Sequence, residues 1–168
     1  HGVQSVEAVT VRGSNGVTSQ MACDGVVLTG DFTPEATLAR MGHLEIDPAT
    51  NGPSVDQWGR CSDPSYFATG NLLRPVETAG WSWAEGQRCG AWVAQDLAKG
   101  LPQGQTAVIF VNDTRLKYAM PQRMTAGTGG MAHVQLRVTT RVKGKLIVQS
   151  EGQTIWTQAI NSGPERRI

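Results

Sequence analysis

Residues 66–81 read YFATGNLLRPVETAGW and join a short apolar segment to the beginning of a helix. The pattern predicts a strand over 66–69 that ends at Gly70 and Asn71. Thr78 is a suitable N-cap, and glycine and proline follow the end of the periodic pattern, so we expect a helix over residues 78–99.

The predicted helix has one apolar side and one polar side. We assign to the apolar side Trp81, Ala84, Cys89, Trp92 and Val93, and to the polar side Glu85, Gln87, Arg88, Gln95 and Asp96.

A strand that ends in a glycine and a polar residue, followed by a helix start, can form a cofactor site. Ligands of α/β sheets lie at the carboxyl ends of strands, and a helix N-terminus offers free N–H groups and partial positive charge. A reduced flavin, with negative charge near N1 and O2, suits such a place. An ordinary capped helix gives the same pattern, and these residues alone favour that simpler interpretation.

Upstream of this stretch, the sequence predicts a hairpin and a buried strand. Alternation over 6–11 and 17–22 flanks the turn at Ser14-Asn15-Gly16. The apolar run 25–29 is typical of a strand covered on both faces, as in a parallel sheet. Thr33 and the proline after it predict a short helix to about Arg40, and turn signals indicate irregular chain over 44–65.

Downstream of Pro102 the periodicity changes from helical to alternating, which predicts a small antiparallel β module. Hairpin turns are expected at Lys143-Gly144 and Glu151-Gly152. The strands are predicted over 106–111, 116–120, 134–142, 145–150 and 153–160.

Composition excludes several classes of protein. Hydrophobic residues make up 39% and charged residues 17% of the 168 residues, which disfavours disorder. The net charge of +1 gives no field that would attract nucleic acid, and no apolar run is long enough to span a membrane. The scattered Cys23, Cys61 and Cys89 predict reduced thiols in the cytoplasm and no metal site.

Three segments resemble FAD-dependent pyridine nucleotide-disulfide oxidoreductases, in particular flavoproteins of the opine-oxidase and hydrogen-cyanide-synthase type. Residues 23–35, CDGVVLTGDFTPE, resemble the closing strand of the NAD(P)-binding domain. Residues 59–71, GRCSDPSYFATGN, resemble the return into the FAD domain, and 77–93 resembles the helix that faces the flavin. The resemblance covers residues 5–98, in the family's order along the chain.

The resemblance implies a mixed α/β fold: the C-terminal portions of two dinucleotide-binding domains, followed by a small antiparallel β-rich domain. The implied domains are 1–45 (end of the NAD(P) domain), 46–100 (FAD domain) and 101–168 (β-rich). The implied function is hydride transfer between a nicotinamide or amine-type substrate and FAD, with NAD(P) as a second cofactor. The FAD contacts would be Gly70, Asn71, Thr78 and Ala79, and Gly30 would lie near the nicotinamide.

The chain departs from the family pattern in four respects. Asn71 stands where the family usually has Asp. The glycine-rich dinucleotide fingerprint is missing, because Gly127–Ala132 precedes a strand rather than a helix and is predicted to be a loop. The redox CxxC pair and a four-cysteine iron–sulfur motif are also missing. No acid–base pair is evident, so the catalytic residues stay unassigned.

We therefore expect a piece of a larger flavoprotein whose partner is its N-terminal remainder, a separate subunit or a second copy. Arg137, Arg141, Lys143 and Lys145 form a basic hairpin side that is either solvated or a docking patch. One alternative is a β-rich interaction module that assembles a flavoprotein complex without catalysis. Another is a stand-alone β-rich structural protein.

Overall fold

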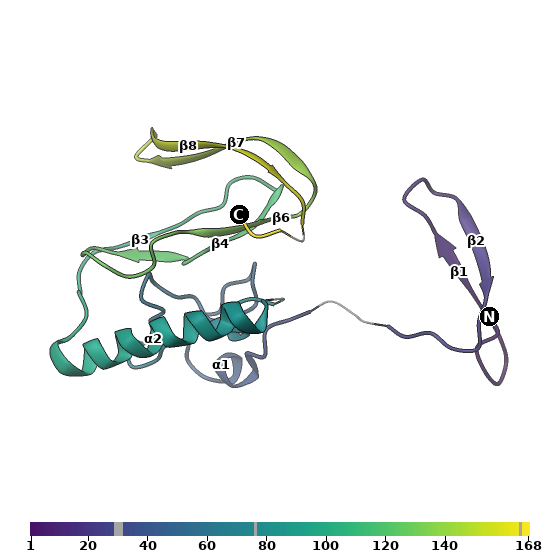
Figure 1. Cartoon of the computed structure of the whole chain (residues 1–168), viewed down its shortest axis with the longest axis horizontal. Helices are drawn as coiled ribbons and strands as arrows, with labels where there is room; N and C mark the ends of the chain where they lie inside the picture. The colour runs from purple at the N-terminus through teal and green to yellow at the C-terminus, as the bar shows by residue number, and fades with distance from the viewer. Residues whose placement is uncertain (29–31, 76, 165) are drawn as a thin grey trace. The chain divides into compact units, whose positions relative to one another are not determined.

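The computed structural model describes residues 1–28, 32–75, 77–164 and 166–168 (Figure 1). The chain forms two compact units, His1–Asp31 and Phe32–Ile168, which we call the N-terminal unit and the main unit. The described part is mixed, with few helices and with four two-stranded antiparallel sheets. The small antiparallel sheets are compatible with the β-rich region that the sequence predicts over residues 101–168.

The N-terminal unit is the predicted hairpin. Strand β1 (Ala8–Arg12) pairs with β2 (Thr18–Ala22), with Ala8 opposite Ala22 and Arg12 opposite Thr18. The Gly13 N–H donates to the Val17 carbonyl at 2.8 Å and closes the turn.

The parallel strand predicted over 25–29 is wrong for its described part, since residues 25–28 form no strand. Val27 and Leu28 are 91% and 87% exposed. An apolar run becomes a buried strand only where neighbouring strands and helices cover it, and none in the described chain does so. Thr29 and Gly30 lie outside the described residues.

The main unit begins with a short helix and continues through irregular chain. Helix α1 (Thr37–Met41) begins later than predicted, with Ala36 rather than Thr33 as its N-cap. The expected strand over 66–69 reduces to a single bridge between Arg60 and Phe67. Residues 52–61 are all buried although they form no strand or helix.

Helix α2 (Ala79–Lys99) confirms the helix expected from the sequence. Gly100 ends it with φ 77°, a left-handed conformation that glycine adopts without strain, and its N–H donates to the Asp96 carbonyl at 2.8 Å. A 3₁₀ turn, η1 (Gly70–Leu72), precedes α2. No helix in the described ranges is both long and apolar enough to cross a membrane.

Six strands follow α2 in antiparallel pairs (Figure 1). β3 (Thr106–Val108) pairs with β5 (Arg123–Thr125), and β4 (Leu116–Met120) pairs with β6 (Gln135–Val138). β7 (Val142–Ser150) pairs with β8 (Gln153–Ser162) through the predicted turn at Glu151-Gly152.

Two of the predictions for this β region have definite outcomes. The turn predicted at Lys143-Gly144 is wrong, because both residues lie inside β7 and pair with Asn161 and Ile160. Gly127–Ala132 forms a loop, as predicted. A Cβ on Gly130 would lie 2.6 Å from the Gln57 side chain, so this loop approaches segment 52–61 closely.

The core of the main unit joins the irregular segments to β4. It contains Val55, Cys61, Ala68 and Leu73 together with Tyr118 and Met120. Compactness therefore divides the chain after Asp31 and groups residues on both sides of 100–101. The division into domains 1–45, 46–100 and 101–168 stays a prediction.

Candidate functional site

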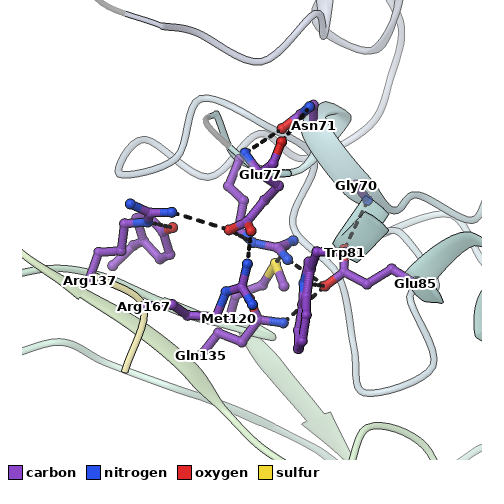
Figure 2. A network of polar contacts seen from close by, with 11 residues as sticks. Gly70, Asn71, Glu77, Trp81, Glu85, Met120, Gln135, Arg137 and Arg167 are labelled. Atoms are coloured by element: carbon purple, nitrogen blue, oxygen red, sulfur yellow. Dashed lines mark hydrogen bonds and ion pairs between the residues drawn. The ribbon is translucent and has the colours of Figure 1, made fainter. Parts of the chain in front are cut away.

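The structure brings together four of the five predicted site residues: Gly70 and Asn71 lie in η1, and Thr78 and Ala79 lie at the start of α2, after the loop that connects the two elements. The side chain of Asn71 reaches across this loop: its Oδ1 accepts from the Glu77 N–H at 2.8 Å and its Nδ2 donates to the Glu77 carbonyl at 3.4 Å (Figure 2). Asn71 therefore lies beside the residue that precedes Thr78 and Ala79. Gly30, the fifth residue, lies outside the described part of the chain.

Gly70 is required by the geometry of the loop. Its φ of 67° lies in the left-handed region, where a side chain would be strained, and a Cβ would contact Ser82 at 3.4 Å. Its N–H donates to Glu85 Oε2 at 3.2 Å. The start of η1 is therefore fixed directly to the second turn of α2.

The start of α2 is open. Thr78, its N-cap, makes no side-chain capping hydrogen bond, and the first turn contains no acidic residue. Thr78, Ala79 and Gly80 are exposed, and a Cβ on Gly80 would meet nothing within 4 Å. The partial positive charge of this helix N-terminus is thus available to an anionic group.

A buried network of charged groups holds this loop in place. Arg74 is fully buried, and its guanidinium donates to Glu77 Oε1 at 3.1 Å and forms a very short ion pair with Glu85. It also contacts the sulfur of Met120 at 3.2 Å. One arginine therefore connects the loop, helix α2 and strand β4.

Glu77 receives two further arginines from distant parts of the chain. Arg137 of β6 lies 3.4 Å from Glu77 Oε1 and donates through Nε to the Tyr118 hydroxyl at 3.0 Å. Arg167 forms a very short ion pair with Glu77 Oε2, and its guanidinium lies 3.7 Å from the centre of the Trp81 ring. Residues 137 and 167 thereby hold the position that precedes α2 (Figure 2).

Glu85 is similarly surrounded by donors. Trp81 Nε1 and Gln135 Nε2 donate to its Oε1 at 2.7 and 3.0 Å. Burial raises the pKa of this carboxyl, but the hydrogen bonds and the charge of Arg74 outweigh burial and hold the pKa below its usual value. Glu85 therefore stays ionised and is suited to holding structure rather than to exchanging protons.

The buried cysteines offer little reactivity. Burial raises the pKa of the Cys61 thiol to about 11, and burial followed by the charge of Glu85 raises the pKa of Cys89. Both remain protonated near neutral pH, where the thiolate is the reactive form. All three cysteines are free, and the described residues contain no cluster of side chains that could hold a metal ion.

The residues that build this network were not predicted as site residues from the sequence, and Glu85 lies on the buried side of α2 rather than on its predicted polar side. Glu85 lies four residues after Trp81 and four before Cys89, so it shares their buried face. That spacing is the one signal that could have indicated a buried carboxylate. The others come together only through tertiary structure: Arg74, Glu77, Gln135, Arg137 and Arg167.

Comparison with known proteins finds no match for this chain among family models, curated proteins or solved structures.

Proposed function

We propose that this chain is the C-terminal part of an FAD-dependent oxidoreductase that transfers hydride between a nicotinamide or amine-type substrate and flavin. One observation carries the proposal: Asn71 is hydrogen-bonded to the residue before the uncapped start of α2. The segments that resemble a flavin-contacting loop and helix are therefore joined by a hydrogen bond. In the proposed protein, residues 1–45 complete an NAD(P)-binding domain and residues 46–100 complete the FAD domain.

The residues present fit the electronic needs of a flavin. The exposed N–H groups of residues 78–80 face no acidic side chain in the first turn, so they favour negative charge at a flavin pyrimidine edge. Asn71 Oδ1 has a second lone pair for a ribityl hydroxyl. When bound, FAD supplies the redox chemistry, while this chain orients the cofactor and stabilises its charge.

The Arg74 network serves this proposal by fixing the loop. Buried ion pairs with several partners leave little freedom to the residues they join. Glu77 is held on its backbone by Asn71 and on its carboxylate by Arg74, Arg137 and Arg167. The helix start is thus preorganised before a ligand arrives, which reduces the entropic cost of binding.

The test uses the native gene product and a substitution that separates binding from folding. Gly80→Asp adds a carboxylate to the open first turn of α2, where a negative charge stabilises the helix. We expect unchanged or higher thermal stability together with a lower flavin-to-protein ratio, measured by visible absorbance. Gly90→Asp, in open space farther along α2, is the matched control that retains flavin.

A native product of about 18.0 kDa that carries no flavin would contradict the proposal. Because the chain lacks a phosphate-cradling glycine fingerprint, we expect the isolated 168-residue chain to bind FAD weakly. Submicromolar binding by this chain alone, measured by flavin fluorescence quenching, would refute that expectation.

The second candidate function, an interaction module, is favoured by the hairpin of β7 and β8, residues 142–162, which we call the arm. Ile147, Ile155 and Trp156 are 53%, 64% and 45% exposed on it. A two-stranded hairpin is marginally stable in water by itself. An apolar partner surface would stabilise it.

Removing residues 105–168 would not test this candidate, because it would delete Tyr118 and Met120 from the core. The double variant Ile155→Asn/Trp156→Ser changes only exposed arm residues. Under the module hypothesis it loses co-purifying subunits, whereas Leu97→Asn on the exposed side of α2 retains them. Equal recovery of the partner with both variants would exclude the arm as the docking element.

A further inference from the structure

Strand β8 leaves one of its long edges unpaired. In the described chain it belongs to a two-stranded sheet in which β7 is its only neighbour (Figure 1). Alternate residues of such a strand direct their N–H and C=O groups away from the neighbour, so about half of the strand presents free backbone groups. Residues 153–159 are all exposed, and this edge is therefore accessible to another extended strand.

The two strands of the arm differ in how their outer edges are protected. β7 carries Lys143 and Lys145, and lysines on an edge strand oppose pairing with a further strand. β8 has the sequence QTIWTQAINS, which contains no charged residue and no proline. A bulge lies at Ile155, because Val148 pairs with Trp156 whereas Gln149 pairs with Thr154. The regular, uncharged and unprotected part of the edge therefore begins at Trp156.

The side chains of residues 156–160 suit pairing with a second copy of the same segment. In an antiparallel pair with a two-fold axis at Gln158, Trp156 of each copy lies directly opposite Ile160 of the other. Cross-strand pairs of an aromatic and a β-branched side chain stabilise a sheet, and Trp156 is 45% exposed, so it has apolar surface left for such a pair. Gln158 faces its own copy, and each amide can both donate and accept.

The charges of the arm favour the antiparallel arrangement. The exposed turn at its tip carries Glu151, whereas Lys143 lies near its other end, opposite Asn161. Antiparallel pairing of two copies brings the acidic tip of each arm toward the lysine-bearing end of the other. A parallel pair would instead bring the lysines of the two copies together. The arm therefore complements a second copy of itself in charge as well as in apolar side chains.

We propose that the outer edge of β8 is a dimerisation site, at which residues 156–160 of two copies of this chain pair antiparallel about Gln158. The two arms then form one four-stranded sheet. Adding a strand satisfies backbone groups that a two-stranded hairpin leaves to water, and it stabilises an element that is marginal by itself. This proposal gives the arm one specific occupant, and it does not rest on the proposed binding of flavin.

The first test measures the mass of the 168-residue chain against its concentration by analytical ultracentrifugation, without flavin. We expect a reversible change from 18.0 kDa toward twice that mass. The Kd should be about 10–100 μM, since so short an edge buries less surface than a standard interface. A chain that remains at 18.0 kDa up to about 1 mM overturns the proposal.

A pair of matched variants locates the contact. Gln158→Lys places like charges directly opposite each other at the axis and should leave a monomer. Gln149→Lys makes the same change at an exposed residue of β7 and should still give a dimer. A dimer that survives Gln158→Lys, or one that is lost equally with Gln149→Lys, overturns the proposal.

The last test identifies the two-fold axis. Gln158→Glu should also be monomeric, whereas an equimolar mixture of Gln158→Glu and Gln158→Lys should restore a dimer, because each copy then faces the opposite charge. In the unmodified chain, raising the concentration should slow hydrogen exchange of amides within residues 156–160 and leave β7 unchanged. A mixture that stays monomeric, or protection that develops at another surface instead, overturns the proposal.

Discussion

Segment 52–61 and the arm satisfy the hydrogen bonds of their backbone in different ways. Segment 52–61 has no regular structure and is completely buried, whereas the arm has long paired strands and is mostly exposed. In the arm, each strand satisfies the backbone groups of the other. In segment 52–61, side chains do much of this: Asp56 accepts from two backbone N–H groups, and Gln57 pairs with the backbone of Thr125.

The comparison shows that chain without regular secondary structure can be buried where backbone and side-chain partners together satisfy its polar groups. Buried backbone groups must be paired, and a carboxylate or amide that reaches the right N–H can replace a strand. We therefore expect that replacing polar residues in the buried irregular region lowers the free energy of unfolding more than replacing residues in the arm.

Arg74→Met should give the largest loss of stability. It leaves Glu77 and Glu85 buried without their shared arginine, which costs about 3–5 kcal/mol of unfolding free energy. Urea unfolding followed by circular dichroism measures it. Arg115→Met, which removes a solvent-exposed ion pair with Asp113, is the control and should change the midpoint little. A similar midpoint for both variants would contradict the importance of the buried network.

Thiol labelling should be much slower for the buried cysteines than for Cys23, which follows the N-terminal hairpin. Burial raises the pKa of Cys61 to about 11, which reduces its thiolate fraction about a hundredfold against an ordinary thiol. Cys23 is only half-buried. Ellman's reagent at neutral pH should modify one thiol in the folded chain and three in urea. Rapid modification of all three in the folded state would argue against the described core.

Gln57→Leu should cost about 1–3 kcal/mol, because it removes both side-chain bonds to Thr125 and leaves these backbone groups unpaired. Gln149→Leu in the arm replaces an exposed glutamine and should stay within about 0.5 kcal/mol of the unmodified chain. Chemical unfolding compares the two. If the arm variant were the more damaging one, side-chain pairing would not be what holds segment 52–61.

The smallest expected effect is a gain in the local stability of the arm. Glu151 has φ 51° and Gly152 has φ 78°, the geometry of a turn that favours Asn-Gly. Glu151→Asn should therefore stabilise the arm by up to about 1 kcal/mol. Slower hydrogen exchange of the β7 and β8 amides would report it, and Gln149→Asn, outside the turn, should leave exchange unchanged.

The sequence predicted the elements whose ends or turns are marked by nearby residues. The helix over 78–99 and the turn at Ser14-Asn15-Gly16 carry their own caps and turn residues, and both are confirmed. The strand over 25–29 depended on neighbours that cover it and is wrong for its described part. The hydrogen bonds of segment 52–61 reach Gln122 and Thr125, more than 60 residues away, so no local pattern could reveal them.

The candidate site likewise has one part that was predictable from the sequence and one part that was not. The proximity of Gly70, Asn71, Thr78 and Ala79 follows from the short loop between η1 and α2 and was predictable. The three arginines on Glu77 arrive from the loop, β6 and the last described segment, and their pairing depends on the complete tertiary fold. Whether the surface binds FAD stays a prediction.

The ion pair between Glu77 and Arg167 spans 90 positions of sequence. During synthesis the ribosome therefore makes the loop before α2 long before it makes the residue that completes it. Until Arg167 emerges, Glu77 has two of its three arginine partners and the adjacent Trp81 face lacks its stacked guanidinium. A chain that stops before Arg167 therefore lacks one of the three arginines that hold Glu77.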